Sequence, residues 1–340
     1  MKKHINIPIF IPHLGCPNDC VFCNQRIISG TEKFEAESVI PIIEQTLSTV
    51  DEDTEIELAF FGGSFTGIDR ELMKSLLMIA NSYLIQGRIT SIRCSTRPDY
   101  INESILDELV KWGVGTVELG MQSVNDSVLC ACRRGHEVID TKNAARMIKA
   151  RGLRLGGQMM VGLPKATPED EIEMANFIVS SGCDEARIYP TLVFKGTELE
   201  KMCKNGEYSP LTLEDAISRS AAVFAVLASA GVRVLRIGLC DSENLHSDET
   251  YFAGPNHAAM GELVVSEYYY SVLKKAITDN KLENNSICVK VAVGHTSKLI
   301  GQHKKNKIRL QSELGIKRLK VQESADIAEY CFALEAEERT

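Results

Sequence analysis

The sequence predicts an α/β fold in which parallel strands alternate with helices, followed by a smaller α+β unit near the C-terminus. Six short apolar runs alternate with amphipathic stretches in the first part of the chain. Uniformly apolar strands are typical of parallel sheets buried on both faces, and a strand–helix–strand order is typical of βαβ units. Because the six runs fall within about 190 of the 340 residues, they favour one barrel or partial barrel over two separate domains.

The expected elements of this barrel follow one another in order. The strand-like runs are 5–11, 56–61, 89–95, 115–121, 153–161 and 185–193. Helix-like stretches lie between them, at about 35–49, 69–86, 101–112, 138–151 and 168–181. The stretch at 69–86 places Leu72, Leu76, Ile79 and Tyr83 on one apolar stripe, which is the pattern of an amphipathic helix.

The alternation loosens after about residue 195. We expect a helix at about 211–231, a strand at 232–239, a polar loop at 240–250 and a helix near 256–278. A basic unit extends from about 287 to 322. The chain therefore divides into a core barrel (1–240), a helical connection (241–285) and a basic C-terminal module with an acidic tail (286–340).

Composition and charge exclude several classes of protein. Hydrophobic residues make up 44% of the chain, which excludes a largely disordered protein. No run approaches 18 consecutive apolar residues, and the N-terminal stretch is interpreted as a strand rather than a signal peptide, so we expect no membrane span and a cytoplasmic location. The net charge of −8 argues against nucleic-acid binding over the whole surface. The segment Lys290–Lys320, however, has nine Lys/Arg against one acid, which predicts an anionic partner or a solvated helical face.

One tight cysteine cluster stands out among the 11 cysteines, which are not expected to form disulfides in such a location. Cys16, Cys20 and Cys23 form a C-x3-C-x2-C loop directly after the first strand. Cysteine thiolates typically hold iron–sulfur clusters, and three ligands on a four-iron cluster leave one iron open for a substrate or cofactor. With His13 as a fourth ligand, a structural zinc site is the alternative.

Other polar motifs also follow predicted strands. Gly62 and Gly63 come directly after one strand, where glycines let a ligand approach the backbone. The remaining motifs are STRPD (95–99), ELGMQS (118–123), RRGH (133–136), QMMVGLP (158–164) and IYPTLV (188–193). Because the C-terminal ends of barrel strands form the rim where active sites are built, we expect these motifs to gather at one face.

These motifs, in this order, resemble the radical S-adenosylmethionine (SAM) superfamily over about residues 4–240. Within it, TRPD, VELGMQS, RRGH, MMVGLP and IYPTLVFKGTELEKMCKNGEY most resemble the radical domain of the Elongator catalytic subunit and its bacterial relatives. No counterpart of that subunit's acetyltransferase domain is expected after residue 240. The resemblance implies a partial (β/α)6 TIM-like barrel, a [4Fe–4S] cluster, SAM, and an electron donor such as a flavodoxin or ferredoxin.

The resemblance also implies roles for individual residues. Cys16, Cys20 and Cys23 would ligate three irons, and the open iron would chelate the amino and carboxylate groups of SAM. The amino group would also be bound by Gly62, Gly63 and Ser64, and the carboxylate by Arg134. The ribose and its polar edge would be held by Ser95, Gln122 and Gln158. The adenine would pack on Phe22 and on the turn Val161–Pro164, which contains Leu163 and Pro164.

The basic segment 289–323 predicts a strand, a helix, a turn, a helix and a strand. It resembles the core of a KH-type RNA-binding module, whose GxxG turn clamps a nucleic-acid backbone. Here the turn is Gly301–Lys304, so the second glycine is missing. The resemblance implies RNA contacts from Lys298, Gly301, Lys304, Lys305, Lys307 and Arg309. A small basic cap on the barrel is the alternative.

Three functional hypotheses follow. The first is a radical SAM enzyme that modifies RNA, with tRNA as the favoured substrate. The second is a radical SAM enzyme acting on a small metabolite or cofactor precursor, with the basic segment as a structural cap. The third is a zinc-stabilised barrel that binds RNA without catalysis. The sequence does not identify a catalytic side chain or an oligomeric state.

Overall fold

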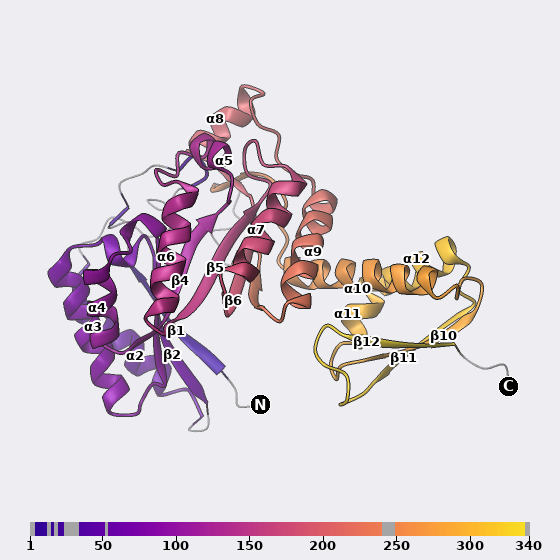
Figure 1. Ribbon diagram of the computed structural model, residues 1–340, viewed down its shortest axis with the longest axis horizontal. Helices are drawn as coiled ribbons and strands as arrows, with labels where there is room; N and C mark the ends of the chain where they lie inside the picture. Colours follow the sequence, from indigo (N-terminus) through magenta and orange to yellow (C-terminus); the bar gives the residue numbers. More distant parts are fainter. Residues whose placement is uncertain are drawn as a thin grey trace.

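The computed structural model describes residues 4–11, 15–16, 20–23, 34–51, 54–239 and 249–336. Figure 1 shows two parts side by side, a sheet covered by helices and a smaller C-terminal module, joined by one long helix. His13, most of the polar loop 240–250 and the last four residues of the acidic tail lie outside the described residues.

The main sheet has seven parallel strands in chain order, with β1 and β8 at its two edges. The strands are β1 (His4–Ile11), β2 (Glu55–Gly62), β3 (Ser91–Thr96), β4 (Val114–Gln122), β5 (Arg154–Val161), β6 (Glu185–Pro190) and β8 (Arg233–Ile237). This sheet confirms the predicted partial barrel, with the expected strand at 232–239 added to its edge as β8. The strand expected over 185–193 ends earlier, at Pro190, whose ring nitrogen carries no N–H. Beyond it, β7 (Val193–Phe194) pairs antiparallel with β9 (Tyr251–Ala253).

Helices connect successive strands and cover the outer face of the sheet (Figure 1). The predicted helices are confirmed as α2 (Val39–Leu47), α3 (Arg70–Ile85), α4 (Glu103–Lys111), α6 (Val138–Ala150), α7 (Pro168–Ser180) and α9 (Leu213–Ser229). Asp69, Asn102, Thr167 and Thr212 accept backbone N–H bonds at four of their N-termini. Two short helices at α5 (Asp126–Ala131) and α8 (Glu198–Lys204) were not predicted, because each is too short to show a helical period.

The two faces of each barrel strand differ in chemistry. On β1, Ile7, Ile9 and Ile11 are buried in the apolar core beneath the helices. On the inner face, Arg93 is 2% exposed and lies between carboxylates from three other strands. Its guanidinium is 2.5 Å from Glu57 Oε2, 3.3 Å from Glu118 Oε2 and 2.6 Å from Glu185 Oε1. The interior of the barrel is therefore charged and internally paired, as buried ions must be.

The C-terminal module contains the elements expected from the basic segment. Helix α10 (Met260–Asp279) leads into β10 (Ser286–Val291), α11 (Thr296–Ile300), α12 (Lys305–Leu314) and β11 (Arg318–Glu323). The region predicted as an acidic tail adds β12 (Phe332–Ala336), which pairs antiparallel with β10. The resulting sheet has the order β11-β10-β12. None of the helices in the described ranges is long and apolar enough to cross a membrane. The cytoplasmic location stays a prediction.

Aromatic packing joins the module to the barrel. Phe224 on α9 packs edge-on against Tyr268 of α10 and Tyr330 of the module, at ring-centroid distances of 5.1 and 4.9 Å. The Tyr268 hydroxyl donates a 2.9 Å hydrogen bond to the backbone oxygen of Tyr330. Beside them, the Tyr269 hydroxyl and His295 Nδ1 are 2.6 Å apart in a buried contact. Such packed aromatic pairs hold the two parts in one orientation.

Gly62 is required at the end of β2 by its conformation and by its neighbour. Its φ is +108°, and an added Cβ would lie far inside van der Waals contact of the Ile11 carbonyl oxygen. We expect Gly62→Ala to lower the free energy of unfolding by at least about 2 kcal/mol, because strain and a steric clash add. Gly87→Ala is the matched control, since Gly87 also has positive φ (+69°) but has nothing within 4 Å of an added Cβ. Gly87→Ala should lower the free energy of unfolding by only about 1 kcal/mol. Urea unfolding of both variants measures the difference, and equal losses would contradict the close-approach argument.

Candidate cofactor site

The cysteine loop follows β1 and is tied to the rim of the barrel. Cys20 is 5% exposed, while Cys16 and Cys23 are partly exposed. A 2.9 Å bond from Cys23 N to Cys20 O makes a tight turn between two of the three cysteines. Val21 N donates to Cys132 O at 3.1 Å, and Leu199 N donates to Val21 O at 2.8 Å. Backbone bonds to the end of α5 and the start of α8 therefore fix this end of the cysteine loop.

A close approach of two glycines fixes the other end of the loop. An added Cβ on Gly15 would clash with the backbone of Gly67, and one on Gly67 would clash with the Gly15 carbonyl oxygen. Gly67 ends a short 3-10 turn, η2 (Phe65–Gly67), just after the predicted Gly62–Gly63 motif. The cysteine loop and the glycine motif thus meet directly, as their positions after neighbouring strands predicted.

Two arginines provide positive charge beside the sulfur atoms. Arg134 Nη1 donates to Cys20 Sγ at 3.4 Å, and its Nη2 donates to Gly120 O at 2.7 Å. Arg97 is buried, and its pKa is raised by its bonds to Asp99 and by the nearby Cys16 and Cys20, against the lowering effect of burial. Positive charge at this position suits the thiolates that ligate metals.

The donor set fits an anionic iron–sulfur cluster. None of the three cysteines is in a disulfide bond, and two guanidinium groups lie beside them. Within the described ranges, no three His, Cys, Asp or Glu side chains lie close enough to hold a single metal ion. A [4Fe–4S] cluster distributes its ligands over separate irons and does not require this tight grouping. The zinc alternative also depended on His13, which lies outside the described residues.

Ser64, one of the predicted SAM-binding residues after β2, lies against the end of β3. The Ser64 hydroxyl is 2.8 Å from the Thr96 hydroxyl and accepts a 3.2 Å bond from Arg97 N. The Thr66 hydroxyl is 2.6 Å from the same Thr96 oxygen. Ser64 is 1% exposed, so its side chain supports the turn from within, while Gly62 and Gly63 leave the edge of the strand accessible.

Ser95, Gln122 and Gln158 lie on β3, β4 and β5, as predicted. Gln158 Nε2 donates to Glu118 Oε1 at 2.6 Å and is 3.5 Å from Ser95 Oγ. Gln122 has a positive φ of 67° beside a register shift between β4 and β5. Its buried Oε1 has no hydrogen-bond partner among the described residues. Buried polar atoms are normally paired, so this oxygen fits a site that takes a polar ligand.

Two of the predicted adenine contacts, Phe22 and Leu163, belong to a second apolar cluster separate from the main core. Leu163 is buried in this cluster and Phe22 packs against it. Pro164 is also buried, at the end of the same turn. The turn is held by Tyr208, whose hydroxyl donates to Gly162 O at 2.6 Å. The structure therefore brings Phe22 and the Val161–Pro164 turn to the same region, although they are about 140 positions apart.

Two polar side chains at this rim, Arg97 and Asp99, were not given roles from the sequence. They lie in the STRPD motif, and His136 of the RRGH motif lies beside them. Arg97 Nη1 and both ring nitrogens of His136 are buried and have no hydrogen-bond partner among the described residues. His136 Nδ1 is 3.9 Å from Asp99 Oδ1. Which motif residue points inward depends on turn geometry, and sequence spacing does not specify it.

The predicted RNA-contact residues are all in the C-terminal module, away from this rim (Figure 1). Lys304 and Lys305 are exposed and Lys307 is partly exposed. Arg309 instead forms a double ion pair with Glu267 and stacks on Tyr270, with its guanidinium carbon 3.4 Å from the ring centroid. Lys298 Nζ is 3.0 Å from His295 Nε2. An added Cβ on Gly301 would press against Ser266 of α10, so the turn packs tightly there.

His136 should make stability depend on pH. Burial, followed by the charges of Arg134 and Arg97, lowers the pKa of His136 to about 4. The unfolded chain therefore binds more protons than the native state between pH 4 and 6.5, so the free energy of unfolding falls as pH falls through that window. The loss attributable to His136 between pH 6.5 and 5 is about 2 kcal/mol. We expect His136→Gln to remove this part of the pH dependence in urea unfolding of the cluster-free protein.

The exposed His257 supplies the matched control for this measurement. His257→Gln should keep the pH dependence of the native protein. The same slope in the native protein and in His136→Gln would contradict the burial argument.

Known protein families and individual proteins resemble this chain. A model described as the radical SAM superfamily matches residues 10–178, and a model of the radical SAM C-terminal domain matches residues 183–270. The tRNA uridine(34) acetyltransferase of Methanocaldococcus jannaschii is 33% identical over 195 residues, 52% of this chain and 36% of that protein. Elongator complex protein 3 of Saccharomyces cerevisiae is 26% identical over 202 residues, 54% of this chain and 36% of that protein.

A solved structure shows the same fold. Elp3 of Methanocaldococcus infernus aligns with a TM-score of 0.59 at 24% identity, covering 83% of this chain and 64% of that one. The chain thus spans about a third of the length of the two curated relatives named above. Its two matched regions follow one another and together cover most of the chain. The chain belongs to the radical SAM superfamily, whose members are enzymes that use a [4Fe–4S] cluster and S-adenosylmethionine.

Proposed function

We propose that this enzyme cleaves SAM reductively and uses the resulting radical to modify RNA, with tRNA as the substrate class. The observation that carries the radical chemistry is the arrangement of the three-cysteine loop, the Gly62–Ser64 turn and two arginines at one rim of the barrel. The RNA substrate is supported by the similar tRNA uridine(34) acetyltransferase and by the exposed lysines of the C-terminal module.

The residues at the rim have distinct tasks in this proposal. A bound and reduced cluster would supply the one electron needed to cleave the S–C5′ bond of SAM into methionine and a 5′-deoxyadenosyl radical, which would take a hydrogen atom from the substrate. Cys16, Cys20 and Cys23 hold the cluster. The backbone at Gly62 and Gly63 binds the SAM amino group, and Ser64 keeps that turn in place through Thr96. Arg134, beside Cys20, pairs with the SAM carboxylate.

Apolar and polar contacts then orient the nucleoside part of SAM. Ser95, Gln122 and Gln158 bind the ribose and its polar edge from three neighbouring strands. Phe22 and Leu163 belong to one apolar cluster, which packs the adenine and keeps water from the reacting bond. A small redox protein of the flavodoxin or ferredoxin type delivers the electron. These assignments rest on the family resemblance and on the positions of the side chains.

The C-terminal module holds the RNA backbone in this proposal. Lys304 and Lys305 are exposed at the start of α12, where Lys304 adopts a left-handed conformation with φ of 61°. Lys307, two residues further along α12, is partly exposed. These three side chains contact phosphates, whereas Arg309 and Lys298 stabilise the module through Glu267 and His295. Lysine contacts to phosphates bind without sequence preference and weaken as salt rises.

Replacing one of the three cysteine ligands should abolish binding of the iron–sulfur cluster. After anaerobic reconstitution with iron and sulfide, we expect Cys20→Ser to lose the four-iron cluster and all formation of 5′-deoxyadenosine from SAM. The reason is that a serine hydroxyl is a far weaker ligand for iron than a thiolate. Cys130→Ser is the matched control, because Cys130 is exposed on α5 and should leave iron and sulfide content unchanged. A full cluster in Cys20→Ser would refute the assignment of this loop.

RNA dependence tests the substrate class. We expect bulk tRNA to stimulate 5′-deoxyadenosine formation by the native enzyme. Lys304→Glu/Lys305→Glu should weaken tRNA binding by about tenfold or more and lower its salt dependence, because two phosphate contacts become repulsive. Cleavage without tRNA should not change. Lys142→Glu/Arg146→Glu reverses two exposed charges on α6 and serves as the control. If tRNA does not change the rate of SAM cleavage by any variant, the substrate is a small molecule rather than RNA.

A further inference from the structure

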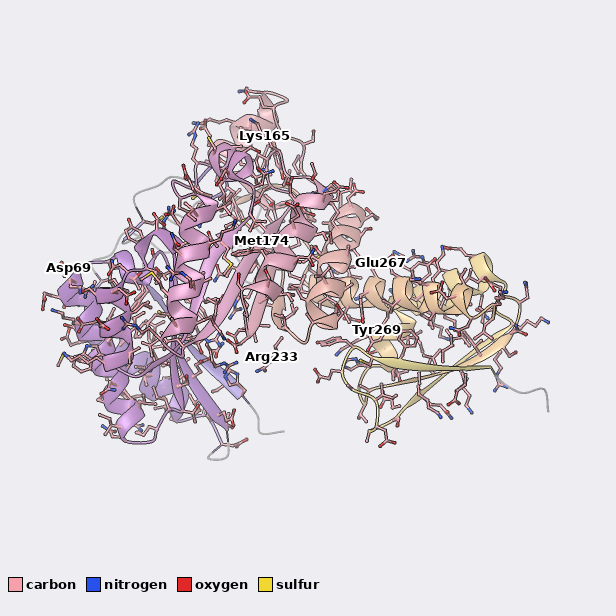
Figure 2. All side chains as sticks on the ribbon, in the orientation of Figure 1. Asp69, Lys165, Met174, Arg233, Glu267 and Tyr269 are labelled. Carbon is pink, nitrogen blue, oxygen red and sulfur yellow. The ribbon has the colours of Figure 1, made fainter. Side chains whose placement is uncertain are left out.

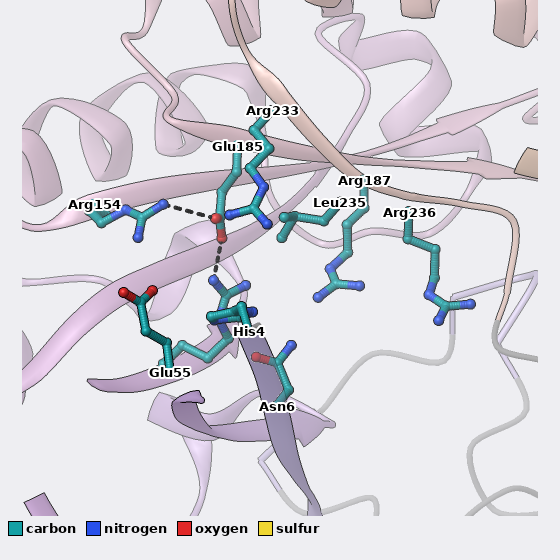
Figure 3. A pocket seen from close by; sticks show the side chains of 10 residues that line it. His4, Asn6, Glu55, Arg154, Glu185, Arg187, Arg233, Leu235 and Arg236 are labelled. Carbon is teal, nitrogen blue, oxygen red and sulfur yellow. Dashed lines mark hydrogen bonds and ion pairs between the residues drawn. The ribbon is translucent and has the colours of Figure 1, made fainter. Parts of the chain in front are cut away.

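A cavity opens at the end of the barrel opposite the candidate cofactor site. Its volume is about 240 Å³, and His4, Asn6, Glu55, Arg93, Arg154, Glu185, Arg187, Arg233, Leu235 and Arg236 line it. Figure 3 shows side chains of β1, β5, β6 and β8 that point into this one space. Five of the ten lining residues are arginines, against two carboxylates. A small cavity this rich in guanidinium groups suits an anion.

The cationic groups are unequally neutralised by carboxylates. Arg93 is surrounded by three glutamates, and Arg154 pairs with Glu185 at 3.2 Å. By contrast, Arg233 and Arg236 have no carboxylate partner among the described residues, and Arg236 makes only a 3.5 Å bond to the Leu239 carbonyl. Glu55 lies across the cavity, on the side away from Arg187 and Arg236 (Figure 3). The positive charge is therefore concentrated along β6 and β8.

The pairing of β6 with β8 places two of these arginines directly opposite each other. The register shifts between Ala186 and Arg187, so that Arg187 pairs with Arg236 rather than with Leu235. Like charges at directly opposed positions of neighbouring strands destabilise a sheet. Arg187 is only 9% exposed, and its Nε lies 2.7 Å from Glu118 Oε1. Glu118 therefore compensates the charge of Arg187 but not the opposing charge of Arg236. Irregular pairing that re-aims a side chain is common beside functional sites.

We propose that this cavity binds a phosphate group, held by Arg187, Arg233 and Arg236. Guanidinium forks match the geometry of phosphate oxygens and donate two hydrogen bonds at once. A volume of about 240 Å³ takes a phosphate with a small attached group, since it lies below the usual range of drug-sized pockets. A bound phosphate would supply the negative charge that the opposed arginines require.

This site is distinct from the radical site. Figure 2 shows Arg233, at the start of β8, at the opposite end of the barrel from Lys165, which follows the Val161–Pro164 turn. The paired charges of Arg93, Glu57 and Glu118 fill the barrel interior between the two ends. The cavity also lies near the C-terminal module. Burial raises the pKa of Tyr330 and the charge of Arg233 opposes that rise, so the two side chains are close enough to interact.

Two sources can supply this phosphate group: a free phosphorylated small molecule, or the backbone of an RNA held by the neighbouring module. The second source rests on the proposed function, whereas the first does not. The cavity itself is argued only from the arginines that line it. Binding experiments on the full chain with its cluster, without any measurement of SAM cleavage, separate these two sources.

The test measures inorganic phosphate binding by calorimetry at constant ionic strength. We expect Arg236→Gln and Arg233→Gln each to weaken phosphate binding by about tenfold or more, the usual effect of losing a charge-assisted hydrogen bond. Arg146→Gln removes an exposed arginine on α6 and should leave it unchanged. Both arginines of β8 are partly or fully exposed, so the variants should fold. No binding to the native protein, or equal binding by all variants, overturns the proposal.

A second measurement identifies the source of the phosphate. If Arg236→Gln also weakens tRNA binding and phosphate competes with tRNA, the group belongs to the RNA backbone. If tRNA binding does not change while phosphate and glycerol 3-phosphate still depend on Arg236, the ligand is a small molecule. Either result supports the site. Because neither readout involves the cluster, failure of the radical assignment would leave this test intact.

Discussion

The barrel depends on one buried interaction, the contact of Arg93 with three glutamates. Arg93 lies on β3, and its partners come from β2, β4 and β6, so one guanidinium links four of the seven strands. Breaking a single pair would leave a buried charge without a partner, which is far more costly than losing an exposed ion pair. Burial raises the pKa of Glu185, and the charges of Arg93 and Arg154 oppose that rise. The inner face can therefore be polar without weakening the sheet.

This polar interior separates two chemical environments. At the C-terminal ends of the strands, cysteines, glycines and two arginines lie together, and we propose that they hold the cluster and SAM. At the N-terminal ends, the arginines of β6 and β8 face a small cavity. The apolar residues lie outside, under the helices, where they supply most of the favourable free energy of folding. Stability and chemistry are thus assigned to opposite faces of the same strands.

The alternation of apolar runs was sufficient to predict the parallel sheet, because buried strands and amphipathic helices differ in period. The gathering of the cysteine loop and the strand-end motifs at one rim was predicted because the C-terminal ends of parallel strands lie at one edge of a sheet. Two features could not be predicted. The pairing of Arg187 with Arg236 depends on a register shift, which no local pattern reveals. The ion pair of Arg309 with Glu267 and its stacking on Tyr270 also could not be predicted, because these partners are over 35 positions away in α10.

The aromatic contact between Phe224, Tyr268 and Tyr330 has a geometric consequence. A flexible linker would let the basic module sample many distances from the rim of the barrel. The packed rings instead oppose changes in the distance between the basic module and the rim of the barrel. A long polymer gripped at Lys304 and Lys305 would present to the reactive centre only the unit that lies one fixed span away. The position of a unit along the polymer, rather than its chemical identity, would then determine where the reaction takes place.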